Sequence, residues 1–194
     1  MEIGATKAVQ DRLKTTKIEE SKGASLVFCW DTHLTKIKGR NVLFIVNASN
    51  RYTIAMTDIE QGNWKYYIMY ISRVIYVVMQ EMGYSEDQIG QYFKMSGDTT
   101  VTKTHGRKSV GGINRMVMDA QYFGKKLEKE AKYQWELSEY LNRDICQPEG
   151  FDAYGYPSEL FKLDMERLGI ISKRKPAKII DFTKYIDTNR STNH

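Results

Sequence analysis

Three histidines and two cysteines are the side chains of this sequence with the widest options for acid–base, nucleophilic or metal chemistry. Asp31 and His33 share one short segment, whereas His105 lies beside Arg107 and Lys108. An acid–base site needs a histidine within hydrogen-bond reach of an orienting carboxylate. We interpret His33 and His105 as surface or turn residues, and we keep an enzyme with a site around either one as an alternative.

Motifs that would indicate a cofactor or a metal are missing from the sequence. Neither HxxxH nor CxxC spacing occurs, and neither a Walker loop, a GxGxxG fingerprint nor a nucleophile elbow is present. We therefore expect no cofactor, no metal site and no catalytic residues. Two cysteines, Cys29 and Cys146, are too few for a disulfide framework, which favours a reducing, cytoplasmic location.

The most suggestive surface element is the junction between residues 102 and 109. Its pattern predicts the end of a strand, a turn and the start of a helix, whose free backbone N–H groups attract anions. Cationic side chains beside those donors could hold phosphate or a carboxylate-rich protein surface. The candidate anion- or partner-binding residues here are Lys103, His105, Arg107, Lys108 and Arg115. The alternative is an ordinary helix start with solvated charges.

The charge of the second half of the chain is unevenly distributed. Residues 99–126 hold six Lys and Arg against one Asp, residues 127–171 carry an excess of five acidic groups, and residues 172–194 are basic again. Lys173, Arg174 and Lys175 in the last segment complete the candidate binding residues. Basic blocks of this kind favour an anionic partner, although a charge run is also typical of a solvated face.

Hydrophobic periodicity predicts the elements that must position these residues. Strands are expected at Ile3–Ala5, within 26–37, at Val42–Val46, at Tyr52–Met56 and at Thr99–Thr104, the middle three as an antiparallel meander. Helices are expected from Thr6 to Leu13, from Trp64 to Met82, from Ser85 to Phe93, from Ser109 to Tyr122, from Lys125 to Leu141, and from a Ser158 cap to Leu168.

Length and composition are typical of one folded domain. The chain has 194 residues, of which 41% are hydrophobic, and no apolar run is long enough to span a membrane. We predict a single α+β domain over residues 1–169, with an antiparallel sheet packed by the long apolar helix and a helical C-terminal half. Residues 170–194 are predicted to form a basic tail.

Several short stretches resemble a known family. They are Ile3–Lys7, Phe28–Leu34, Val42–Tyr52, Thr102–Val110 and Leu141–Pro157. Over about residues 1–160 the chain is similar to a family of small bacterial and phage proteins that is catalogued only as a domain of unknown function. The resemblance implies one compact α+β domain and a bacterial or phage source, and it implies no catalytic residues.

These observations favour a non-enzymatic binding or inhibitory protein. Its expected partner is a nucleic acid or a nucleic-acid-handling protein, and an anti-CRISPR protein or an antitoxin would be a specific form. The thirteen tyrosines suit an interface. Besides the enzymatic alternative, a self-associating structural domain that buries the apolar helix 64–82 stays open, so a homo-oligomer is possible.

Overall fold

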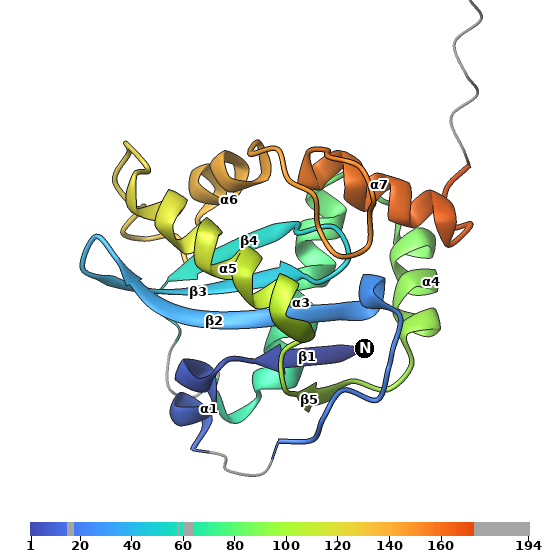
Figure 1. Ribbon diagram of the computed structural model, residues 1–194, viewed down its shortest axis with the longest axis horizontal. Helices are drawn as coiled ribbons and strands as arrows, with labels where there is room; N and C mark the ends of the chain where they lie inside the picture. The colour runs from blue at the N-terminus through green and yellow to red at the C-terminus, as the bar shows by residue number, and fades with distance from the viewer. Residues whose placement is uncertain (15–17, 58, 60–63, 173–194) are drawn as a thin grey trace, which may run out of the picture.

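The computed structural model describes residues 1–14, 18–57, 59 and 64–172, and within them a five-stranded sheet lies between two layers of helices (Figure 1). The strands are β1 (Glu2–Ala5), β2 (Cys29–Ile37), β3 (Arg40–Asn47), β4 (Thr53–Thr57) and β5 (Thr100–Thr102), in the order β4-β3-β2-β1-β5. The α+β class is confirmed.

The predicted antiparallel sheet is correct only for the three strands of the meander. The sheet as a whole is mixed. β2, β3 and β4 pair antiparallel, whereas β1 lies parallel to both β2 and β5. Parallel neighbours require a crossover connection. Helix α1 (Lys7–Leu13) lies in the connection between β1 and β2, and two longer helices lie between β4 and β5.

The helices are α1, α3 (Tyr67–Glu81), α4 (Glu86–Ser96), α5 (Gly106–Gln121), α6 (Trp135–Asn142) and α7 (Pro157–Arg167), and a short 3-10 helix (Leu26–Phe28) precedes β2. The helix predicted from Ser85 is confirmed as α4, which a capping box of Ser85 and Gln88 opens, and Gly83 has a positive φ after α3. The expected cap at Ser158 is wrong. Pro157 is the first helical residue, where its missing N–H is not needed.

The helix predicted from Lys125 to Leu141 is also wrong in its first half, because α6 begins only at Trp135. The Gln134 side chain bonds the backbone of Glu128 and Ala131, and Arg40 donates to the Glu128 carbonyl. The backbone N–H and C=O groups of this segment therefore form hydrogen bonds with Gln134 and with Arg40 of β3, and not with one another in a helical turn.

Two apolar cores lie on the two faces of the sheet. On one face α3, α4 and α7 pack against residues such as Ile3, Trp30 and Ile45, and Ile75 of α3 is fully buried there. On the other face α5 and α6 cover Val42 and Phe44. The predicted core helix is therefore confirmed as α3. Ile170, placed in the predicted tail, is buried in the first core.

Candidate functional site

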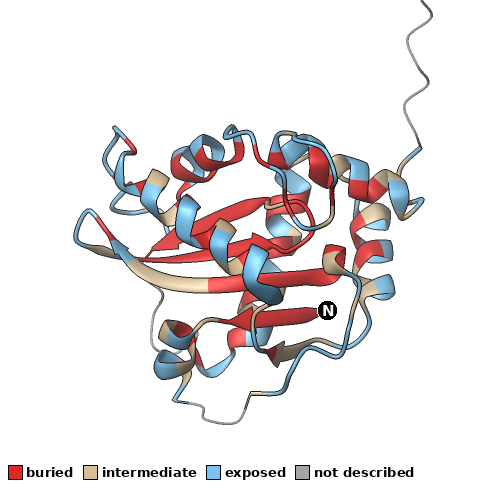
Figure 2. Ribbon diagram, viewed as in Figure 1, coloured by how far each residue is buried: buried red, intermediate tan, exposed pale blue. Residues whose placement is uncertain are grey.

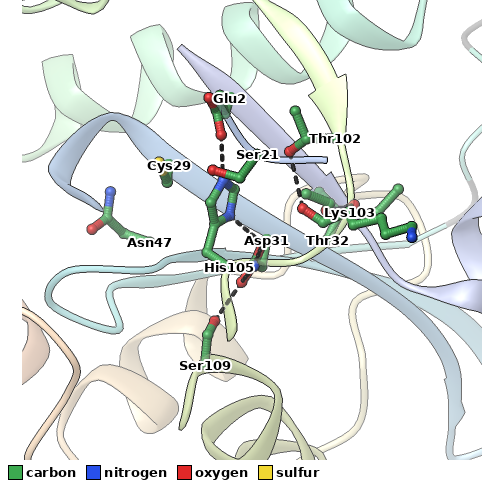
Figure 3. A network of polar contacts seen from close by, with 12 residues as sticks. Glu2, Ser21, Cys29, Asp31, Thr32, Asn47, Thr102, Lys103, His105 and Ser109 are labelled. Carbon is green, nitrogen blue, oxygen red and sulfur yellow. Dashed lines mark hydrogen bonds and ion pairs between the residues drawn. The ribbon is translucent and has the colours of Figure 1, made fainter. Parts of the chain in front are cut away.

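A group of buried polar side chains lies on β1 and β2 under the first turn of α5 (Figure 3). The parallel register pairs Glu2 with Cys29 and Gly4 with Asp31. Because side chains alternate along a strand, all four residues share the face covered by α5. The intervening residues Ile3 and Trp30 point into the apolar core on the opposite face. This alternation brings the polar residues together.

His105, the residue before α5, lies between two carboxylates. Its Nδ1 is 2.7 Å from Asp31 Oδ1, and its Nε2 is 3.0 Å from Glu2 Oε2. The His105 side chain is only 3% exposed, and those of Asp31 and Glu2 are 0% and 5% exposed. A carboxylate only accepts hydrogen bonds, so both ring nitrogens carry a proton and His105 is a buried imidazolium.

Asp31 also accepts hydrogen bonds from residues at the start of helix α5. The backbone N–H of His105 lies 3.2 Å from both Asp31 oxygens, and the Ser109 hydroxyl donates to Oδ2 of the same carboxylate. A negative charge at this end of a helix is stabilised by the free N–H groups and by the helix dipole. Asp31 therefore supplies a negative charge to the start of α5 from inside the chain.

The neighbouring side chains in this group shift the pKa values of His105 and Glu2. Burial by itself lowers the pKa of His105, but the hydrogen bond and the charge interaction with Asp31 outweigh it and raise the pKa to about 10. Burial acts to raise the pKa of Glu2, and hydrogen bonds from Ser21, His105 and the Lys22 backbone reverse the effect, so the pKa of Glu2 is lowered. The raised pKa of His105 and the lowered pKa of Glu2 keep this histidine and this glutamate charged at neutral pH.

Gly4 provides the space that this arrangement needs. A Cβ atom built on Gly4 would lie 1.9 Å from Asp31 Oδ1 and 3.1 Å from His105 Nδ1. Any side chain at this position would displace the carboxylate from under α5. Glycine is required at this position because the Asp31 and His105 side chains lie where a Cβ atom would stand.

Cys29 completes the group on the side of Glu2. The Cys29 thiol lies 3.5 Å from the Ser25 carbonyl and 3.7 Å from that of Ala24. One ligand atom from each of Glu2, Cys29 and His105 lies within 4.8 Å of the other two. No metal-ligand spacing in the sequence indicated this cluster, because its members lie on three different elements.

The candidate binding residues around α5 fall into two environments. His105 lies in a bend directly before α5, as a turn residue would, but its side chain is buried, so its interpretation as a surface residue is wrong. Lys103, Arg107, Lys108 and Arg115 are exposed. Lys103 pairs with Glu20, and Arg115 approaches Asp119 at 3.6 Å. Lys173, Arg174 and Lys175 lie outside the described residues.

His33, the other candidate for acid–base chemistry, lies apart from this group's hydrogen bonds. Its Nδ1 is 3.2 Å from the Thr6 hydroxyl, and burial lowers its pKa. No carboxylate of the described residues is bonded to its ring. His105 has the orienting carboxylate that such chemistry needs, yet both of its nitrogens are already bonded and its side chain is buried. Both ring nitrogens of His105 are thus engaged by carboxylates of the same chain.

Sequence reasoning missed Glu2 and Ser109 and did not connect Asp31 or Cys29 with His105. One signal was present. Glu2 directly precedes the predicted strand Ile3–Ala5, and Asp31 lies within the predicted strand segment 26–37, each beside a large apolar residue; a charge that such a strand buries needs a partner. Periodicity did not reveal which partner, because His105 is 103 residues from Glu2.

The mixed sheet between two helical layers, with charged groups buried under one helix, defines an α+β protein. The model of the domain of unknown function DUF6933 matches residues 2–160, and the chain belongs to this family. No curated protein matches the chain, and no solved structure matches it either. Among the described residues, no helix has both the length and the apolar character to cross a membrane.

Proposed function

We propose that the protein is a non-enzymatic binding protein that holds a nucleic acid on the exposed face of α5. We define the α5 cationic face as Arg107, Lys108 and Arg115, which are exposed on one helix. Figure 2 shows exposed stretches of α5 in pale blue. The observation that carries the proposal is the charge of this segment. Between Asp98 and Asp119 the chain has four lysines and arginines and no acidic residue.

The position of two of these cations is unfavourable for the helix itself. Arg107 and Lys108 lie in the first turn of α5, which contains no acidic residue. The dipole of a helix disfavours positive charge at this end. Residues that break a local stability rule are candidates for function, because folding alone does not account for them. Asp31 offsets the charge from below but leaves the outer side of the turn cationic.

The shape of the face also suits an extended polyanion. Arg107, Gly111 and Arg115 follow one another at intervals of four residues, which places them along one side of the helix. A rise of ~1.5 Å per residue separates the two arginine positions by roughly 12 Å along the axis. Gly111 has open space where a side chain would stand, so a phosphate backbone can approach closely. Met118 and Tyr122, 61% and 79% exposed, supply apolar contact further along.

Fluorescence anisotropy of a labelled mixed-sequence DNA duplex and of a single strand, over a range of salt concentrations, tests the proposal. Replacing Arg107, Lys108 and Arg115 together with Gln should weaken binding. The slope of log affinity against log salt should fall by up to about three, because each cation that meets a phosphate contributes about 0.9 for duplex DNA.

The matched control replaces Arg73, Lys94 and Lys162 with Gln. These cations lie on α3, α4 and α7, across the sheet from α5, and the substitution removes the same charge. The proposal requires the control to keep most of the parent's affinity and salt slope. Equal losses in both triple variants would mean that only net charge matters, and the α5 cationic face would then have no special role. Absence of binding to either nucleic acid would point instead to an acidic protein partner.

A further inference from the structure

We propose that Glu2, Cys29 and His105 form a zinc-binding site inside the fold, with Asp31 as the residue that orients His105. The proposal is independent of nucleic-acid binding. It rests on three different ligand types that the parallel pairing of β1 with β2 and the start of α5 bring to one place (Figure 3). Their ligand atoms lie within 4.8 Å of one another.

The chemistry of the three side chains suits zinc. Thiolate, imidazole and carboxylate are its usual protein ligands, at about 2.3 Å for sulfur and about 2.0–2.2 Å for nitrogen and oxygen. Nε2 of His105 and Oε2 of Glu2 are 3.0 Å apart. Two ligand atoms at tetrahedral angles around zinc would stand about 3.3 Å apart on those bond lengths. His105 and Glu2 would therefore need only a few tenths of an ångström of movement to bind the ion together, and the Cys29 sulfur, within 4.8 Å of both ligand atoms, would move in to complete the set.

The orientation of His105 is the second observation. Asp31 holds Nδ1 at 2.7 Å and turns Nε2 toward Glu2 and Cys29. A ligating histidine characteristically gives its other ring N–H to a carboxylate, which sets the ring angle and makes the free nitrogen a better ligand. Asp31 is itself held by Ser109 and by the His105 backbone N–H. The supporting contacts of a metal site are thus already in place.

Metal binding would exchange protons for the ion without changing the surroundings of Asp31. The thiol proton of Cys29 and the Nε2 proton of His105 would leave, and zinc would replace the hydrogen bond between His105 and Glu2. The exposed stretch that includes Ser21 and Lys22 covers Glu2 from outside, and the Lys22 N–H bonds Glu2 Oε1 at 2.9 Å. Displacing this stretch of chain would free Glu2 Oε1 from the Lys22 N–H and open Glu2 to the ion, and water could supply a fourth ligand.

Cobalt binding to the chelator-treated full-length protein tests the site directly. Co²⁺ bound by a thiolate in a tetrahedral site gives a sulfur-to-cobalt charge-transfer band and intense visible bands, and zinc should abolish them at one equivalent per chain. We expect these bands in the parent and in Cys146→Ser, and their loss in Cys29→Ser. Cys146 is the matched control, since it is also buried and lies in a separate cluster.

A stability measurement keeps the test independent of spectroscopy. Zinc at about a hundredfold excess over its dissociation constant should raise the Tm of the parent by roughly 5–10 °C and leave that of Cys29→Ser unchanged. Glu2→Gln serves as a second variant, with zinc affinity reduced at least tenfold. Absence of both the cobalt bands and the Tm shift in the parent would overturn the proposal. Bands that survive in Cys29→Ser would overturn the assignment of the ligands.

Discussion

The two faces of β1 and β2 are built from alternate residues of the same short segments, yet their chemistry is opposite. On one face Ile3 and Trp30 enter a continuous apolar core under α3. On the other face Glu2 and Asp31 are just as buried but hold an imidazolium between them. Burial is therefore equal on the two faces, and what differs is whether each buried group depends on a specific partner.

The two faces differ in how strictly each one requires particular residues. The apolar face is held by contacts that many side chains of similar size could make. The polar face is held by hydrogen bonds that fail as a unit when one member is lost, because the remaining charges stay buried without partners. The polar face is also the one that carries side chains able to bind a ligand.

The largest effect should come from a charge on the apolar face. Ile75→Asp buries a carboxylate where no cation or donor is available, and it should lower the free energy of unfolding by about 5 kcal/mol or more. Val74→Asp should cost less, because Val74 borders a cavity of about 340 Å³. Expression and thermal melting would measure both. An Ile75→Asp protein that melts like its Ile75→Val control would show that α3 is peripheral.

On the polar face, Asp31→Ala should lower the free energy of unfolding by about 3 to 5 kcal/mol, the usual effect of breaking a buried charge pair. Ser109, the ring of His105 and the first turn of α5 all lose their acceptor. Asp31→Asn keeps the shape and removes the charge, so its loss should be smaller. Urea denaturation gives both values. Identical stability of parent and Asp31→Ala would mean that the charged group is dispensable.

Alanine substitutions at two glycines should change the free energy of unfolding in opposite directions. Gly4→Ala should destabilise the fold by about 1–3 kcal/mol, because its Cβ would overlap Asp31. Gly111→Ala, on the open side of α5, should stabilise by up to about 1 kcal/mol through better helix propensity. Chemical denaturation of the two single variants distinguishes them. Changes of the same sign would contradict the close packing around Gly4.

The smallest effect on stability should come from the outer side of α5. Arg107→Gln combined with Lys108→Gln should change the Tm by less than about 2 °C, and upward, since cations are disfavoured at this end of a helix. Differential scanning calorimetry at low salt would show the sign. A marked fall in Tm would mean that these residues stabilise the fold, which would weaken the case for a functional face.

Much of the local structure followed from the sequence, and the reasons can be named. The strand Val42–Val46 and the helix that starts at Ser85 were both predicted, because each depends on neighbours within a few residues. The helix expected over residues 125–134 failed, because contacts with the distant Arg40 and β4 hold that backbone. Local propensity cannot register such contacts.

The sequence by itself determined the α+β class, the core helix α3 and the cationic character of α5, because periodicity and charge are properties of consecutive residues. Only the tertiary structure decided that β1 lies parallel between β2 and β5, and that His105 closes over Glu2 and Asp31. Parallel pairing depends on crossovers whose ends are far apart in the chain. The buried charged group depends on that pairing, since its carboxylates would have no common partner in any other register.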